Sequence, residues 1–114
     1  MIDEGVRIMN GTDPPVEDID PMASFHCSVS RVLSNGSVFA PEQKMSRFQA
    51  LKSYTIDNAY AAFEEDIKGT LEVGKLADIT VLSQDIMSVA EEEIPNTKVL
   101  YTILGGEVKF QNTN

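Results

Sequence analysis

Residues 69–82 read Gly-Thr-Leu-Glu-Val-Gly-Lys-Leu-Ala-Asp-Ile-Thr-Val-Leu and divide the chain into two unlike halves. The last four residues of this stretch form a β-branched and leucine run that favours a strand. Further on, residues 99–104 and 108–110 are separated by Gly105-Gly106, a pair that supplies the positive φ angles of a tight hairpin turn. The sequence therefore predicts a small antiparallel sheet in this half. The other expected elements are a short strand at 71–73 and an acidic connection at 83–97.

Upstream of residue 69 the hydrophobic spacing predicts three helices. The first begins at Asp20, a good N-cap, with Pro21 in the first helical position, and it stops before Gly36. Its buried stripe is expected to consist of Met22, Phe25, Val29 and Val32. The second helix is expected from Pro41, with Met45, Phe48 and Leu51 on one face, and the third from an N-cap at Thr55 to Phe63.

A single strand is predicted before these helices, at residues 6–9. It ends in a loop whose two prolines, Pro14 and Pro15, cannot donate to a sheet. A buried strand needs neighbours for its backbone groups, and the nearby sequence offers none. The fold class is therefore mixed α/β and incomplete, with one strand and three helices ahead of a small sheet, and we expect a segment upstream of Met1.

The charge balance excludes some partners. The 114 residues include 18 acids and 9 bases, for a net charge of −9, and no basic cluster occurs. We therefore expect no nucleic-acid binding and no anionic membrane surface as a partner, because both need a basic patch. One cysteine excludes a disulfide within the chain and fits a cytoplasmic protein.

Asp13 is the leading candidate for chemistry. It lies at the carboxyl end of the predicted strand, followed directly by Pro14-Pro15. A carboxylate fixed in such a loop is well placed to hold a metal ion or to move a proton. The alternative is an ordinary Asx-type turn in Gly-Thr-Asp-Pro, which the residues alone favour.

The other candidate sites are weaker. His26 and Cys27 are adjacent on a predicted helix and point about 100° apart, so they form neither a zinc site nor a nucleophile–base pair. The spacing of Gly69, Gly74 and Lys75 matches that of a phosphate-binding loop. A leucine follows Lys75 where such a loop needs Ser or Thr to hold magnesium, so a phosphate site is not expected. The acidic runs 64–66 and 91–93 are expected to be solvated, and a cation-binding cage is the alternative.

Two motifs in the right order resemble those of metal-dependent amidohydrolases. Residues 9–16, Met-Asn-Gly-Thr-Asp-Pro-Pro-Val, resemble the end of the eighth barrel strand of that family. Residues 69–82 resemble its Gly-x-Leu-x-x-Gly-Lys-x-Ala-Asp signature, and residues 55–62 the helix before it. The sequence around Asp13 is most similar to that of the family-3 type of amidohydrolase, which includes N-substituted formamide deformylases and proteins labelled exoenzyme regulatory protein.

This resemblance implies a fold and a role for each segment. Residues 1–68 would be the last strand and helices of a (β/α)8 barrel, and residues 69–114 part of a small β-sandwich. Asp13 would ligate zinc or another divalent metal, take the proton from the attacking water and pass it to the leaving nitrogen of an amide-type substrate. Lys75 and Asp78 would be structural.

A barrel needs about 250 residues, so the chain is expected to be a C-terminal portion that is inactive and binds no metal by itself. The alternative is a free-standing acidic binding or structural module derived from an amidohydrolase. In either case the apolar faces that would pack on a barrel predict a homo-oligomer. A cytoplasmic location is expected, although a signal peptide could precede Met1.

Overall fold

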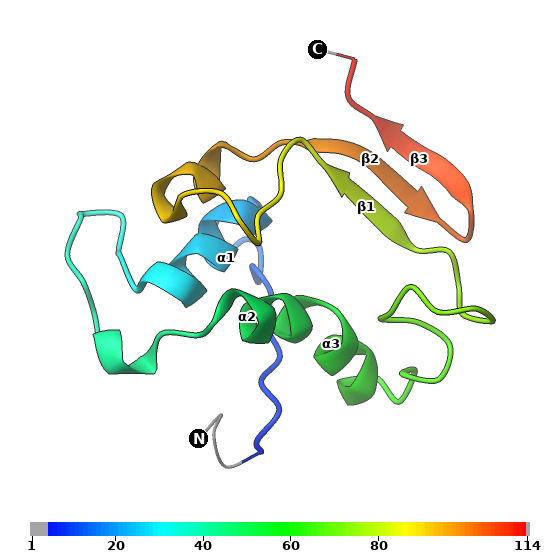
Figure 1. Cartoon of the computed structure of the whole chain (residues 1–114), viewed down its shortest axis with the longest axis horizontal. Coiled ribbons are helices and arrows are strands. Elements are labelled where there is room, and N and C mark those ends of the chain that lie inside the picture. The colour runs from blue at the N-terminus through cyan, green and yellow to red at the C-terminus, as the bar shows by residue number, and fades with distance from the viewer. Residues whose placement is uncertain (1–4, 114) are drawn as a thin grey trace.

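The computed structural model describes residues 5–113 and has helices and a sheet side by side. In chain order the helices are α1 (Pro21–Ser30), the 3-10 turn η2 (Pro41–Gln43), α2 (Arg47–Tyr54) and α3 (Ile56–Ala61). Strand β1 (Ile79–Leu82), the 3-10 helix η3 (Glu91–Asn96) and strands β2 (Val99–Leu104) and β3 (Glu107–Gln111) follow. Figure 1 shows the helices grouped together and the sheet extending away from them. The mixed α/β class is therefore confirmed.

The sheet is antiparallel with the order β1-β2-β3. Strands β2 and β3 form the predicted hairpin, and both turn glycines have positive φ, 58° at Gly105 and 83° at Gly106. The Asp78 carboxylate accepts a hydrogen bond of 2.8 Å from the Gly105 N–H, so the end of the signature segment holds this turn. The strand expected at residues 71–73 is absent, because this stretch lies between two turns set by Gly69 and Gly74, each with φ 96°.

Helix α1 begins as predicted, with the Asp20 carboxylate accepting a hydrogen bond of 2.9 Å from the Met22 N–H. It ends earlier than expected, at Ser30, because Arg31 adopts a left-handed conformation with φ 59°. Val32, expected in the helix, instead pairs with Val38 in an isolated antiparallel bridge.

The second helix begins at Arg47, and its expected start at Pro41 is wrong. Pro41 opens only the turn η2, whereas Ser46 and Gln49 form a capping box. The Ser46 hydroxyl accepts from the Gln49 N–H at 3.2 Å, and the Gln49 side chain accepts from the Ser46 N–H at 2.8 Å. Phe48, expected on the buried face, is exposed.

We expect Ser46→Ala to lower the free energy of unfolding by about 1 kcal/mol, because the substitution leaves an N–H at the helix start without its acceptor. Urea unfolding followed by circular dichroism measures the change. Ser34→Ala, in an exposed turn, is the matched control. Equal unfolding midpoints for the two variants would contradict this role of Ser46.

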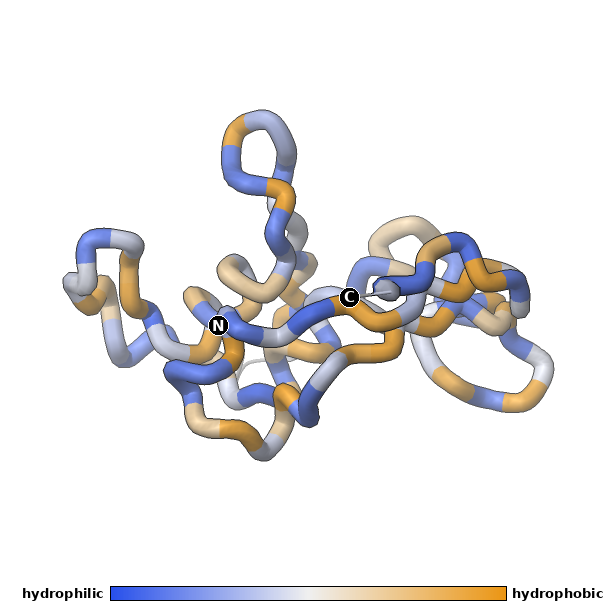
Figure 2. The backbone as a smooth tube through the Cα atoms, turned by 90° about the horizontal axis from the view of Figure 1, so that it is seen from above, coloured by the Kyte–Doolittle hydropathy of each residue, from blue (hydrophilic) through white to orange (hydrophobic). Residues whose placement is uncertain are grey.

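The hydrophobic core lies between α1, α2 and the segment that carries η3. Its buried members are Phe25, Val29, Ala50, Ile86 and Ile94. The predicted α1 stripe supplies the first two of these. The 3-10 helix η3 was not expected in the acidic connection, yet it contributes the fully buried Ile94. Figure 2 shows that hydrophobic residues also occur on segments that project from the body.

The predicted strand at residues 6–9 is wrong for the described chain. This stretch is extended but joins no sheet. Strand pairing needs a neighbour to exchange backbone hydrogen bonds. The next residue along, Asn10, donates its backbone N–H to the Ser53 carbonyl of α2 at 2.9 Å. Among residues 5–113, no helix has the length and apolar character required to cross a bilayer.

Candidate functional site

Asp13 lies in an exposed loop after the extended segment. Its backbone has φ 49°, an unusual value for a residue with a side chain, and the Pro14–Pro15 peptide bond is cis. The Asp13 carbonyl accepts a hydrogen bond of 2.9 Å from the Val16 N–H, which closes a tight turn. This turn is closed by the Asp13 carbonyl and not by its carboxylate, so it differs from the Asx-type turn considered above. Within the described residues the Asp13 carboxylate is exposed and makes no hydrogen bond or ion pair.

Asn10 attaches this loop to the helices. Its backbone N–H donates to the Ser53 carbonyl and its backbone carbonyl accepts from the Asn58 side chain, both at 2.9 Å. Its side-chain amide donates to the Ser53 hydroxyl at 2.9 Å and to the Ser28 hydroxyl at 3.4 Å. The start of the Asp13 loop is therefore bound to α1, α2 and α3 together.

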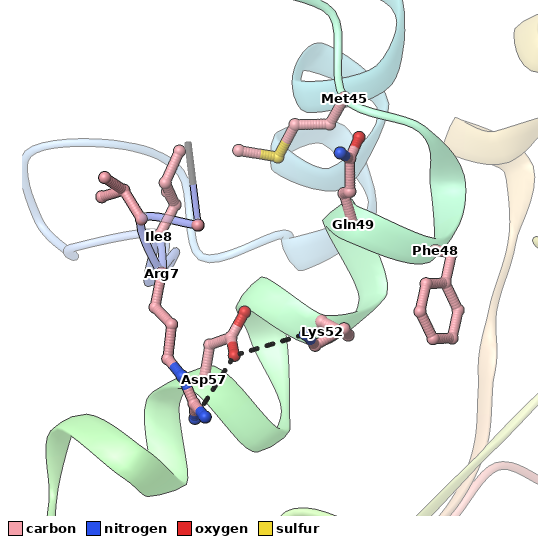
Figure 3. A pocket seen from close by; sticks show the side chains of 9 residues that line it. Arg7, Ile8, Met45, Phe48, Gln49, Lys52 and Asp57 are labelled. Atoms are coloured by element: carbon pink, nitrogen blue, oxygen red, sulfur yellow. Dashed lines mark ion pairs between the residues drawn. The ribbon is translucent and has the colours of Figure 1, made fainter. Parts of the chain in front are cut away.

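A cavity of about 300 Å³ lies farther back along the same segment, between residues 5–8 and the helices α2 and α3. Figure 3 shows the Asp57 carboxylate between Arg7 and Lys52. The Asp57 oxygen lies 3.9 Å from the Arg7 guanidinium and 4.0 Å from the Lys52 ammonium, and the Asp57 side chain is only 9% exposed. The Arg7 guanidinium also stacks 3.8 Å above the Tyr60 ring, so charge and stacking both hold this segment on α3.

Sequence reasoning missed Arg7, Asn10 and Asp57. Several of their partners lie far away in sequence: Asn10 and Ser53 are 43 residues apart, and Asn10 and Asn58 are 48 residues apart. A usable signal in the sequence is Asp57 itself, the one charged residue of α3. A charge at such a position usually has a partner.

The signature segment, residues 69–82, is held by polar contacts of its own. The Lys75 ammonium donates to the Glu65 carbonyl at 2.7 Å and pairs with the Glu72 carboxylate at 3.0 Å. A hydrogen bond from the Thr70 hydroxyl, with help from Lys75, holds the pKa of Glu72 below its ordinary value of 4.5. These contacts support a structural role for Lys75.

We expect this lowered pKa to make stability depend on pH. A carboxyl group whose pKa is lower in the folded state stabilises the fold at pH values above its ordinary pKa. This stabilisation is lost as the pH falls through the lowered pKa. The difference in urea midpoint between the wild type and Glu72→Gln should therefore be largest near neutral pH and vanish in acid. Glu92→Gln, an exposed acid in η3, is the control. A Glu72→Gln difference that persists unchanged in acid would contradict this assignment.

His26 and Cys27 lie half-buried on α1, beside a cavity of about 640 Å³. Asp20 and Asp18 also line it, yet no three His, Cys, Asp or Glu side chains within residues 5–113 gather closely enough to hold a metal ion. The acidic runs 64–66 and 91–93 likewise form no such group in that part of the chain.

Nearly all of the chain matches one family of enzymes. Residues 1–110 match the model of the Amidohydrolase family. This protein therefore belongs to the amidohydrolase family, as the two motifs predicted.

Relatives of this chain are much longer. It is 30% identical over 113 residues to N-substituted formamide deformylase of Arthrobacter pascens, a match over 99% of this chain and 21% of that protein. It is 35% identical over 98 residues to Protein LONG AFTER FAR-RED 3 of Arabidopsis thaliana, over 85% of this chain and 17% of that protein. It is 26% identical over 121 residues to 5-methylthioadenosine/S-adenosylhomocysteine deaminase of Caldanaerobacter subterraneus subsp. tengcongensis, over 95% of this chain and 27% of that protein. No solved structure matches.

Proposed function

We propose that residues 1–114 form the C-terminal portion of a metal-dependent amidohydrolase that hydrolyses an amide or related C–N bond. Membership of the amidohydrolase family over residues 1–110 is the observation that carries this proposal. The names of two relatives, a formamide deformylase and a deaminase, support the bond type. The small share of each relative that the chain spans, 21% and 27%, supports a portion of a larger enzyme.

In the proposed architecture, residues 1–68 complete a (β/α)8 barrel and residues 69–114 belong to a small β-sandwich. Residues 6–9 are extended, and three of the four (Val6, Ile8 and Met9) are apolar. A neighbouring barrel strand would give them the backbone partners that a strand requires. The three-stranded antiparallel sheet supplies one layer of the sandwich. Both its outer strands, β1 and β3, leave an edge free for further pairing among the described residues.

Asp13 is the residue to which we assign the chemistry. The described residues do not complete a metal site, because Asp13 offers one carboxylate and no companions. It fits the place of a single oxygen ligand to zinc or another divalent ion whose other ligands lie outside this portion. Such an ion, when bound, lowers the pKa of its water.

The role that we assign to Asp13 is the one implied by the resemblance of its loop to the family motif, and its exposed carboxylate supports that role. A carboxylate there accepts a proton from the attacking water and returns it to the leaving nitrogen of the substrate. Inactivity of the isolated chain, its self-association and a cytoplasmic location stay predictions. The free-standing binding module is less well supported, because the family match covers the Asp13 loop as well as the sheet.

The coding sequence upstream of Met1, followed by an assay, tests this proposal. We expect an in-frame barrel with a His-x-His pair, and we expect the complete polypeptide to hydrolyse N-substituted formamides or related amides only when loaded with metal. Removal of the metal with a chelator should abolish turnover, and zinc should restore it. A stop codon directly upstream, or metal-independent turnover by the 114 residues alone, would overturn the proposal.

A further inference from the structure

Asn10 fixes the start of the Asp13 loop to the helices. Its backbone N–H, its backbone carbonyl and its side-chain amide are all engaged by helices. In Figure 1 the N-terminal trace passes beside α2 on its way to α1. Three independent attachments fix both the position and the orientation of this residue.

The hydrogen bonds around Asn10 require an amide donor. The Ser53 hydroxyl donates its own proton to the Ala50 carbonyl at 2.6 Å, so it must accept from Asn10. The Ser28 hydroxyl similarly donates to the Ser24 carbonyl at 3.1 Å, so it too accepts. Each hydroxyl has one proton to give, and a carboxylate in place of the amide would therefore face two acceptors.

Asp13 follows Asn10 after only two residues. Three backbone steps span at most about 11 Å, so the anchored Asn10 limits the positions that the Asp13 carboxylate can reach. The positive φ of Asp13, 49°, is costly for a residue with a side chain and needs support from its surroundings. Asn10 gives this support on one side and the Val16–Asp13 hydrogen bond gives it on the other.

We propose that Asn10, held by Ser53 and Asn58, is a positioning residue that keeps Asp13 in its reactive place. This inference rests on the proposed amidohydrolase function. Neither family motif assigns a role to the residue, which precedes the Gly-Thr-Asp sequence. Asn10 acts through the hydrogen bonds that its side-chain amide donates. A side chain of the same shape without N–H donors cannot make them.

The decisive variant is Asn10→Asp, which keeps the shape and removes both donors. Asn35→Asp is the matched control, because it adds the same charge and its side-chain oxygen can still accept from the Ser37 N–H and hydroxyl. In the 114-residue chain we expect NMR order parameters at Gly11, Thr12 and Asp13 to fall from about 0.85 to below about 0.6 in Asn10→Asp. Asn35→Asp should leave them unchanged.

In the complete enzyme we expect Asn10→Asp to lower kcat by about 10²-fold with little change in KM, because a small misplacement of a catalytic group costs that much. Ser53→Ala removes one acceptor without adding charge and should lower kcat in the same direction by a smaller factor. Ser53→Ala also tests the inference if the Asn10→Asp variant does not fold. An unchanged kcat and an ordered loop in both variants, while Asp13→Asn is inactive, would overturn this inference alone. An active Asp13→Asn enzyme would instead overturn the role proposed for Asp13, and with it this inference.

Discussion

Asp13→Asn is expected to lower kcat/KM of the complete amidohydrolase by about 10²- to 10⁴-fold, the usual contribution of a positioned proton-transfer group. Asparagine has nearly the same shape but cannot accept a proton at neutral pH. The Asp13 carboxylate is exposed and makes no hydrogen bond or ion pair among the described residues, so the substitution should leave the fold intact. Steady-state hydrolysis by the metal-loaded enzyme measures the loss, and urea unfolding checks stability.

Asp18→Asn is the matched control for this prediction. Asp18 lies five residues further along, in the same exposed part of the chain, and belongs to neither family motif. We expect it to keep nearly full activity. Equal activity of the Asp13 and Asp18 variants would remove Asp13 from the mechanism.

Gly69→Ala is expected to destabilise the fold by about 2–4 kcal/mol, because a new methyl group meets both strain and a clash. Gly69 has φ 96°, which side chains rarely adopt. Its added Cβ would lie 2.8 Å from the Ala59 Cβ and 3.0 Å from the Ile56 Cα of α3. The glycine thus lets the signature segment lie directly against α3.

Gly74→Ala separates the two effects. Gly74 has the same φ of 96°, but its added Cβ would meet no atom within 4 Å. We expect it to show only the backbone strain, about 1–2 kcal/mol. Urea unfolding of both variants gives the difference, which is the cost of the clash. Equal losses would contradict close packing of Gly69 on α3.

Local signals in the sequence predicted several elements correctly. Asp20-Pro21 set the start of α1, and Gly105-Gly106 set the β2–β3 turn, because each motif acts on its own neighbours. The true start of α2 was also visible in the sequence, as Ser46 and Gln49 have the spacing of a capping box. Pro41, the predicted start, begins only one 3-10 turn.

Elements that depend on distant partners could not be predicted in this way. Residues 6–9 have the composition of a strand, but composition cannot supply the neighbour that a strand pairs with. Asp13 was identified from a motif, whereas the contacts that hold its loop join Asn10 to Ser53 and Asn58, more than 40 residues away. Such contacts exist only once the helices have packed.

The assignment of Asp13 as a metal ligand is tested most directly by a crystal structure of the complete protein grown with zinc, with the ion located by anomalous scattering. We expect one Asp13 carboxylate oxygen about 2.0–2.2 Å from the ion, together with histidine ligands from outside residues 1–114. A fully ligated ion with the Asp13 carboxylate outside its coordination shell and outside hydrogen-bond reach of its water would contradict the assignment.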